Sequence, residues 1–200
     1  MQTYIVDIAG EPVTLPIVPI NQRLAISLLM VIDMGVRFGE RIGQALAGKL
    51  APLKPDIIVG AATLGIPVVI EVSRALGLDH YVIAQKSPKV HLADALVQEV
   101  ESVTSAGKQR LMLDRRSAPL LAKRRVGVVD DVVATSSSLA ATFALARSAG
   151  AEIVGAGVIL TEGHDWKKKL GADASLIHGL GHIPQFALAD GKATPMPETL

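Results

Sequence analysis

The 200-residue sequence lacks several features that would narrow its function at once. It has no cysteine, which excludes disulfide bonds, thiolate catalysis and cysteine-ligated zinc. Lysine and arginine total 20 against 19 aspartates and glutamates, so no strong net field draws the chain to nucleic acid or to an anionic membrane. Aromatic residues make up only 3% of the chain, so few rings are available to stack on a ligand. An anionic ligand must therefore be bound by groups that the fold gathers locally.

The sequence also has no long hydrophobic run. The longest apolar stretch, LAISLLMVIDMGV at 24–36, has 13 residues and includes Asp33, whereas a helix needs about 20 residues to cross a bilayer. The opening MQTYIVDIAG does not combine a basic region with an apolar block, as a secretory leader does. We therefore expect a cytoplasmic protein with no membrane partner.

Short β-branched runs alternate with amphipathic stretches along the chain. This order is typical of an α/β domain in which an open, mostly parallel sheet is flanked by helices. Half of the residues are hydrophobic, which is enough for the core of one domain spanning 1–200. The polar stretch at about 90–116 is irregular, which is typical of a lid or binding loop. The patterns predict helices at 22–49 (capped by Asn21), 66–76 and 139–148, and strands at 55–60, 80–85, 125–130, 152–160 and 174–181.

The stretch RRVGVVDDVVATSSSLAAT at 124–142 carries the strongest functional signal. Asp130 and Asp131 close a predicted strand, and ligands of an open parallel sheet bind at the carboxyl ends of its strands. The ATSSS that follows precedes a helix, whose first N–H groups favour a phosphate, and Thr135 and the three serines add hydroxyl donors. The carboxylates suit sugar hydroxyls or a hydrated Mg²⁺. The alternative is a simple N-cap at Ser138 beside a solvated strand end, but one cap needs one hydroxyl and four stand in a row.

The segment VVDDVVATSSS resembles the phosphoribosyl pyrophosphate (PRPP) motif of the type I phosphoribosyltransferases. In that motif an apolar strand is followed by two acidic residues, two apolar residues and a small-Thr-Gly-Gly-Thr loop. Ser136 and Ser137 stand where the family usually has glycine, so we expect strain if the backbone needs a positive φ there. The resemblance implies that PRPP is bound by the loop residues Ala134, Thr135, Ser136, Ser137 and Ser138.

Two further segments resemble the same family, whose order of elements is matched over roughly 20–160. VGAATLGIP falls where the family has a pyrophosphate loop, although the arginine that adenine enzymes usually carry there is missing. QKSPK is similar to the Arg-Lys-Pro-Gly-Lys segment of the adenine enzymes. The resemblance implies phosphate contacts from Ala62, Thr63, Leu64, Gly65, Lys86 and Lys89.

The polar stretch at about 90–116 corresponds to the flexible catalytic loop of the family, and KQRLMLD resembles its return strand. The Tyr-Gly element that adenine enzymes commonly carry before this strand is not evident. Lys108 and Arg110 are further candidate pyrophosphate ligands.

The resemblance implies transfer of a phosphoribosyl group from PRPP to a nitrogenous base, with a purine such as adenine as the expected substrate and pyrophosphate as the second product. Asp130, Asp131 and Lys86 are the implied catalytic residues. Mg²⁺ is the implied cofactor, bound mainly through PRPP and water, with the two aspartates as its candidate protein ligands. The resemblance also implies a homodimer, and we expect no nucleic-acid partner.

A small hood from the chain ends, at about 1–20 and 161–200, is implied to hold the base over the core. Phe186 and Trp166 are its candidate ring contacts. His178 and His182 are four residues apart, but the glycines and proline near them disfavour a helix, so we do not expect them to share a metal.

Two other classes of function stay open on the sequence. The two serines, the missing Tyr-Gly and the missing loop arginine would suit a PRPP-binding regulator that has lost transfer, although no DNA-binding segment is evident. A phosphoryl-transfer metal site on Asp130 and Asp131, as in a receiver domain or a phosphatase, would need an acidic nucleophile at another strand end. The segment DIIVGAAT supplies none.

Overall fold

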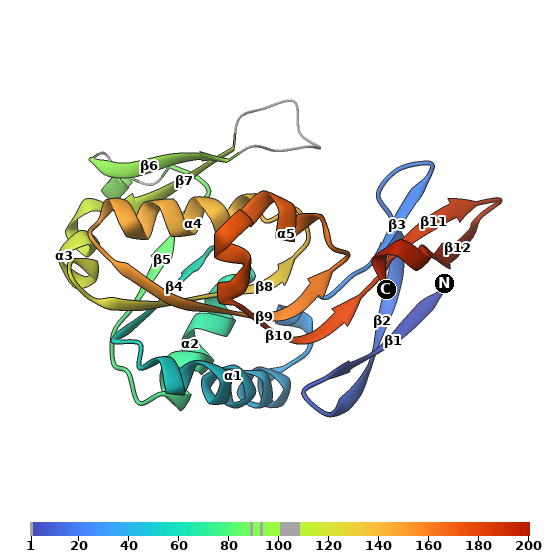
Figure 1. Ribbon diagram of the computed structural model, residues 1–200, viewed down its shortest axis with the longest axis horizontal. Helices are drawn as coiled ribbons and strands as arrows, with labels where there is room; N and C mark the ends of the chain where they lie inside the picture. The colour runs from blue at the N-terminus through green and yellow to red at the C-terminus, as the bar shows by residue number, and fades with distance from the viewer. Residues whose placement is uncertain (1, 89, 93, 101–108) are drawn as a thin grey trace.

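A parallel sheet of five strands, in the order β10-β9-β8-β4-β5, forms the centre of the molecule (Figure 1). The computed structural model describes residues 2–88, 90–92, 94–100 and 109–200. The middle strands are largely buried, as in a sheet that helices cover on both faces. The predicted α/β class is thus confirmed. The strands are β4 (Ile57–Ala61), β5 (Tyr81–Ala84), β8 (Arg125–Val133), β9 (Glu152–Glu162) and β10 (Ile177–Ile183).

Helices lie on both faces of this sheet (Figure 1). On one face, Ile42, Leu46 and Val69 join a buried cluster with residues of β4, β8 and β9. On the other face, Phe143 and Leu145 belong to a second cluster. The first face is covered by α1 (Val36–Leu50) and α2 (Gly65–Ala75), and the second by α4 (Ser137–Ser148), with α3 (Ala118–Leu121) and α5 (Asp165–Leu170) packed into the same cluster.

The two ends of the chain together form an antiparallel sheet, the hood, in the order β1-β2-β3-β11-β12. It lies at the end of the molecule where β9 and β10 finish (Figure 1). The expected boundary at 161 is wrong, because β10 pairs with β9 in the central sheet and the chain enters the hood only at Gln185. The hood strands are β1 (Thr3–Ile8), β2 (Glu11–Pro19), β3 (Leu24–Ser27), β11 (Gln185–Ala189) and β12 (Lys192–Pro195).

The helix predicted at 22–49 is wrong over its first part. Leu24–Ser27 forms strand β3, because it can pair with both β2 and β11, and this pairing overrides a local helical pattern. Asn21 caps no helix: its Oδ1 accepts hydrogen bonds from the N–H groups two and three residues later, at 2.8 and 2.9 Å. Helix α1 begins only at Val36, after Gly35 with a φ of +81°.

The polar stretch after β5 contains an antiparallel ribbon of β6 (Ala95–Val100) and β7 (Gln109–Asp114). Leu111 and Leu113 are buried in the cluster around α4, so β7 is anchored to the core. A strand therefore lies where the sequence predicts a return strand. Within the described part of the chain, no helix is both long and apolar enough to cross a membrane.

Candidate active site

The candidate site begins at the carboxyl end of the central strand β8. Val128 and Val129 are fully buried between β4 and β9, and Asp130 continues the strand with only 9% of its surface exposed. Asp130 Oδ1 accepts a hydrogen bond from the backbone N–H of Asp131 at 3.0 Å. Asp131 is partly exposed. One buried and one accessible carboxyl group thus lie near the carboxyl end of the central strand.

A tight loop joins β8 to α4 and lines a cleft at the start of the helix. Ser136 has a φ of +58°, so the condition for strain is met at the first of the two positions where the family has glycine. Its hydroxyl donates to the carbonyl of Thr135 at 2.6 Å. The hydrogen bond from Ala140 N to Ser136 O, at 2.8 Å, starts the helix, so the preceding N–H groups have no partner within it. Such N–H groups at a helix start favour an anion.

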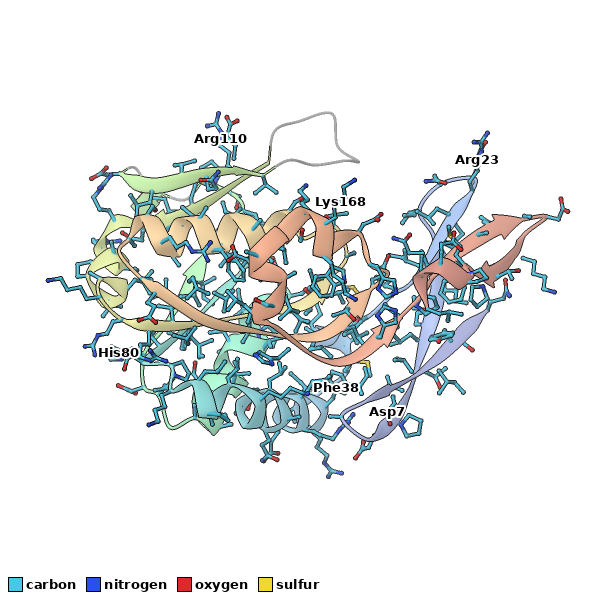
Figure 2. All side chains as sticks on the ribbon, in the orientation of Figure 1. Asp7, Arg23, Phe38, His80, Arg110 and Lys168 are labelled. Atoms are coloured by element: carbon cyan, nitrogen blue, oxygen red, sulfur yellow. The ribbon has the colours of Figure 1, made fainter. Side chains whose placement is uncertain are left out.

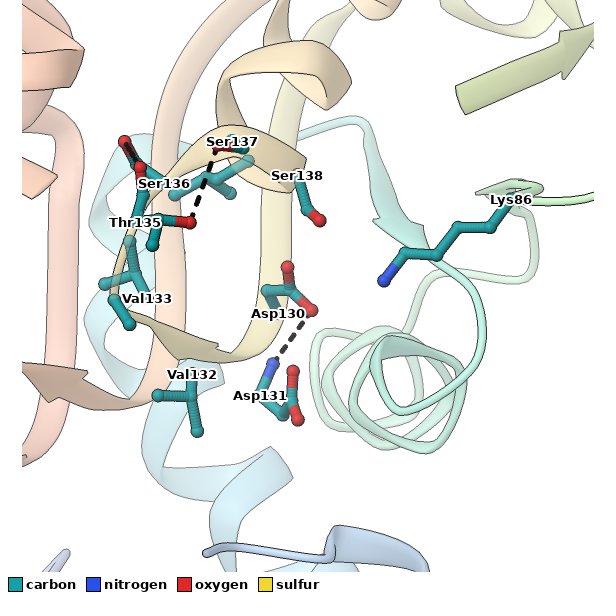
Figure 3. A pocket seen from close by; sticks show the side chains of 11 residues that line it. Lys86, Asp130, Asp131, Val132, Val133, Thr135, Ser136, Ser137 and Ser138 are labelled. Carbon is teal, nitrogen blue, oxygen red and sulfur yellow. Dashed lines mark hydrogen bonds between the residues drawn. The ribbon is translucent and has the colours of Figure 1, made fainter. Parts of the chain in front are cut away.

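A cleft of about 170 Å³ lies between this loop and the end of β5. Lys86, just after β5, points its ammonium toward Asp130, and the hydroxyl of Ser138 is turned to the same space (Figure 3). The cleft therefore brings together the three implied catalytic residues and the whole predicted phosphate loop. Its described lining consists of Lys86, Asp130, Asp131, Val132, Val133, Ala134, Thr135, Ser136, Ser137, Ser138 and Leu139.

Burial raises the pKa of Asp130 well above its ordinary value, and the negative charge of Asp131 raises it further. A hydrogen bond with the Asp131 side chain acts in the same direction. The backbone N–H of Asp131 and the charge of Lys86 oppose these effects without cancelling them. Ionised Asp130 is therefore held in the folded protein at a cost in stability, which is a common feature of functional sites.

Asp130→Asn is expected to unfold at a higher temperature than the wild-type protein at about pH 8, by a margin that shrinks toward about pH 5. Because the folded-state pKa of Asp130 is raised, stability falls as the pH rises from the unfolded-state value of 3.8 through the folded-state value. The amide does not ionise. For a chain of this size, each kcal/mol added to the free energy of unfolding raises the unfolding temperature by roughly 2–4 °C. Thermal unfolding across this pH range tests the prediction with the exposed Asp79→Asn as control, and a margin independent of pH would contradict it.

The predicted pyrophosphate loop, Ala62 to Gly65, follows β4 and approaches Asp130 at Gly65. A Cβ at Gly65 would stand 3.3 Å from Asp130 Oδ1, so a larger residue would crowd this carboxyl group. Thr63 is exposed and Ala62 is buried. The backbone N–H of Ala62 donates to Ala84 O at 2.8 Å. The peptide bond between Ala62 and Thr63 is cis. Residues 62–65 do not line the described cleft, but Gly65 lies next to Asp130, which does.

Arg110, another predicted site residue, is not among the described residues that line the cleft. Arg110 is exposed on β7, and its side chain lies on the outer side of the ribbon, away from the parallel sheet (Figure 2). Lys89 and Lys108 lie outside the described residues. The pyrophosphate contacts implied for these three basic residues stay predictions.

The two aromatic residues predicted to contact a base are packed in the interior. Phe186 is 1% exposed and meets Tyr4 edge-on, at 5.5 Å between ring centroids. Trp166 is 6% exposed and its indole N–H donates to Gly163 O at 3.0 Å. Neither ring presents an open face on which a base could stack, because packing of the hood and of α5 covers both.

Of the two histidines of β10, His182 has structural partners. His182 bonds to the Thr161 hydroxyl and to the carbonyl of Thr199, both at 2.8 Å, and its ring stacks on His164 at 5.2 Å. Within the described residues, no cluster of three or more histidine, aspartate or glutamate side chains could hold a metal ion. The site thus offers a metal one or two carboxylates and no complete protein cage. This donor set suits Mg²⁺ that arrives with a polyphosphate and keeps most of its waters.

Sequence reasoning missed one basic residue at the site. Lys169 of α5 donates from Nζ to Ser137 Oγ at 2.8 Å, beside the phosphate loop. It is one of three consecutive lysines, and no local pattern marks which of them faces the loop.

We expect the glycine variant to be the more stable one at residue 136 and the alanine variant to be the more stable one at residue 137. Both substitutions remove the hydroxyl, so their difference reports the backbone. At residue 136, Ser136→Gly should be more stable than Ser136→Ala by about 1 kcal/mol, because a positive φ strains any residue with a Cβ. At residue 137, the first residue of α4, Ser137→Ala should be more stable than Ser137→Gly, by less than the roughly 0.5–1 kcal/mol of a position in the middle of a helix. Denaturant unfolding of the four variants measures both differences, and the same order at both positions would contradict the loop conformation.

Comparison with known proteins agrees with this geometry. Residues 38–181 match the family described as the phosphoribosyl transferase domain. A xanthine phosphoribosyltransferase of Laribacter hongkongensis is 29% identical over 156 residues, which cover 77% of this chain and 81% of that protein. An adenine phosphoribosyltransferase of Rhodospirillum centenum is 29% identical over 117 residues, 58% of this chain and 65% of its own length. A solved adenine phosphoribosyltransferase from Thermoanaerobacter pseudethanolicus shares the fold with a TM-score of 0.70 and 21% identity, over 83% of this chain and 94% of that one. With the motif, the fold and the family match in agreement, the chain belongs to the phosphoribosyltransferase family.

Proposed function

We propose that the protein transfers the 5-phosphoribosyl group of PRPP to a ring nitrogen of a purine base, with adenine as the first candidate. The observation that best supports this proposal is that one cleft is lined by a phosphate loop, two carboxyl groups and a lysine. In the reaction, a bond forms between the base nitrogen and C1 of the ribose, and the bond from C1 to the pyrophosphate oxygen breaks. The attacking atom belongs to the base, so the protein needs no nucleophile of its own.

Each group of the cleft has a role in this reaction. The loop N–H groups and the hydroxyls of Thr135 and Ser138 bind the 5′-phosphate. Asp130 and Asp131 accept hydrogen bonds from the ribose hydroxyls and so orient C1 toward the base. Lys86 neutralises charge on the departing pyrophosphate. Asp130 and Asp131 would be the protein ligands of a Mg²⁺ ion that arrives with PRPP, and such an ion would supply further charge neutralisation.

Purine specificity is supported by two separate observations. Relatives at 29% identity are named for xanthine and for adenine, which are both purines, although two others, at 28% and 31%, are named for orotate, which is a pyrimidine. The QKSPK segment, which contains Lys86, is similar to a segment of the adenine enzymes. The choice of base depends on the pocket and not on the fold, so it has to be measured.

Calorimetric titration with PRPP and Mg²⁺, followed by a panel of bases and detection of pyrophosphate, tests this proposal. Adenine, hypoxanthine, guanine, xanthine and orotate form the panel. Binding of PRPP followed by pyrophosphate release with a purine alone is the expected result. Release with orotate alone would refute purine specificity. Binding without release for any base would favour the regulator over the enzyme, and absence of PRPP binding would overturn both.

A further inference from the structure

The phosphate loop has little positive charge of its own. Among the described residues that line the cleft, Lys86 alone is cationic, and its ammonium points toward Asp130 (Figure 3). A phosphate monoester carries roughly −2 at neutral pH. The start of α4 offers the equivalent of about half a positive charge. A further cation near the loop would therefore strengthen binding of a 5′-phosphate.

Lys169 supplies a cation beside this loop. Its Nζ donates to Ser137 Oγ at 2.8 Å, and the hydroxyl of Thr135 lies 3.5 Å from the same oxygen. Thr135 and Ser137 both line the cleft. The three polar groups thus form a continuous chain from the cleft to the ammonium on α5.

The position of Lys169 is set by the docking of α5 against the core. Trp166 and Leu170 of this helix are buried, at 6% and 8% exposure, in the cluster that includes α4. Lys169 directly precedes Leu170. Because the helix is anchored on both sides of it, the lysine stem starts from a fixed point close to the loop.

We propose that Lys169 is a further positioning residue for the 5′-phosphate of PRPP and acts through the hydroxyl of Ser137. The inference rests on the proposed function, since it assigns a role within the same site. A serine hydroxyl that accepts from an ammonium keeps its own proton, which it can donate to a phosphate oxygen. Polarisation by the adjacent charge strengthens that donor. The pair exists only because residue 137 has a side chain, where the family motif has glycine.

A purely structural role for Lys169 makes a different prediction. Lys169 also lines a neighbouring cleft of about 210 Å³ between β6 and α4, together with Gln98 and Glu99. If it only holds the ribbon against α4, its replacement would lower stability and leave the affinity for phosphate ligands unchanged.

Calorimetric titration of Lys169→Gln with ribose 5-phosphate and, separately, with Mg²⁺-pyrophosphate tests the proposal. We expect the Kd for ribose 5-phosphate to rise roughly five- to tenfold, the effect of weakening one charge-assisted contact at a partly exposed site, and the Kd for pyrophosphate to change less than about twofold. Lys168→Gln, one residue earlier and exposed on the same helix (Figure 2), is the matched control and should bind both ligands as the wild type does. Lys169→Arg should recover most of the affinity, and thermal unfolding shows whether each variant is folded.

The outcomes separate this inference from the proposed function. If wild-type protein binds PRPP and Lys169→Gln binds ribose 5-phosphate equally well, the role of Lys169 is overturned and the proposed function stands. Equal losses for ribose 5-phosphate and pyrophosphate would indicate a general effect of charge and also overturn it. If wild-type protein binds neither PRPP nor ribose 5-phosphate, the proposed function fails first and the inference fails with it.

Discussion

Asp130→Asn combined with Asp131→Asn is expected to lower kcat/KM for phosphoribosyl transfer by about 10³-fold or more, with the fold intact. The two carboxyl groups lie near the end of β8 and line the same cleft as the phosphate loop, where the proposed function has them accept hydrogen bonds from the ribose hydroxyls. An asparagine side chain keeps the size but loses the charge and half of the acceptor capacity. Pyrophosphate release with the accepted base measures the loss.

The control for this experiment is an equal change of charge away from the cleft. Asp79→Asn with Asp190→Asn removes two exposed carboxylates, one before β5 and one in the hood hairpin between β11 and β12. This variant should retain the wild-type rate. Normal turnover of the variant at residues 130 and 131 would contradict the ribose assignment, whereas loss of its fold would be visible by circular dichroism.

The site was predictable because its residues are close together in sequence. Asp130, Asp131 and the four hydroxyl residues after them fall within one strand-loop-helix unit, and the polarity of that unit has no structural need. Lys86 was predicted only through the resemblance of QKSPK to a segment of the adenine enzymes, since a lysine by itself is usually a solvated surface charge. The conformation of Ser136 could only be stated as a condition, since φ depends on how the loop closes.

The features that the sequence did not reveal depend on distant partners. Leu24–Ser27 is a strand because Gln185 and its neighbours pair with it from the other end of the chain. No local period contains that information. Phe186 is buried for the same reason, since the hood encloses it once both chain ends meet. Lys169 faces the loop because Trp166 and Leu170 fix the rotation of α5, which a run of three lysines cannot indicate.

Lys86→Gln is expected to lower kcat/KM for PRPP by about 10²-fold, because a single preorganised charge at a leaving group contributes on this order. The ammonium faces Asp130 across the cleft, where the pyrophosphate would leave (Figure 3). The same variant should also shift a titration. Since the charge of Lys86 lowers the pKa of Asp130, its removal raises that pKa further.

The acid limb of the pH–rate profile should therefore move to higher pH in Lys86→Gln if ionised Asp130 is the active form. Lys86→Arg keeps the charge, so it should keep the limb in place even if altered geometry lowers the rate. Lys49→Gln, at the end of α1, is the control for a change of net charge alone. A rate loss with no shift of the acid limb would mean that Lys86 acts only on the leaving pyrophosphate and not on the pKa of Asp130. A shift without a rate loss would contradict its role at the leaving group and leave only its effect on Asp130. Both changes together would show that one lysine serves the leaving group and keeps the buried carboxyl group ionised.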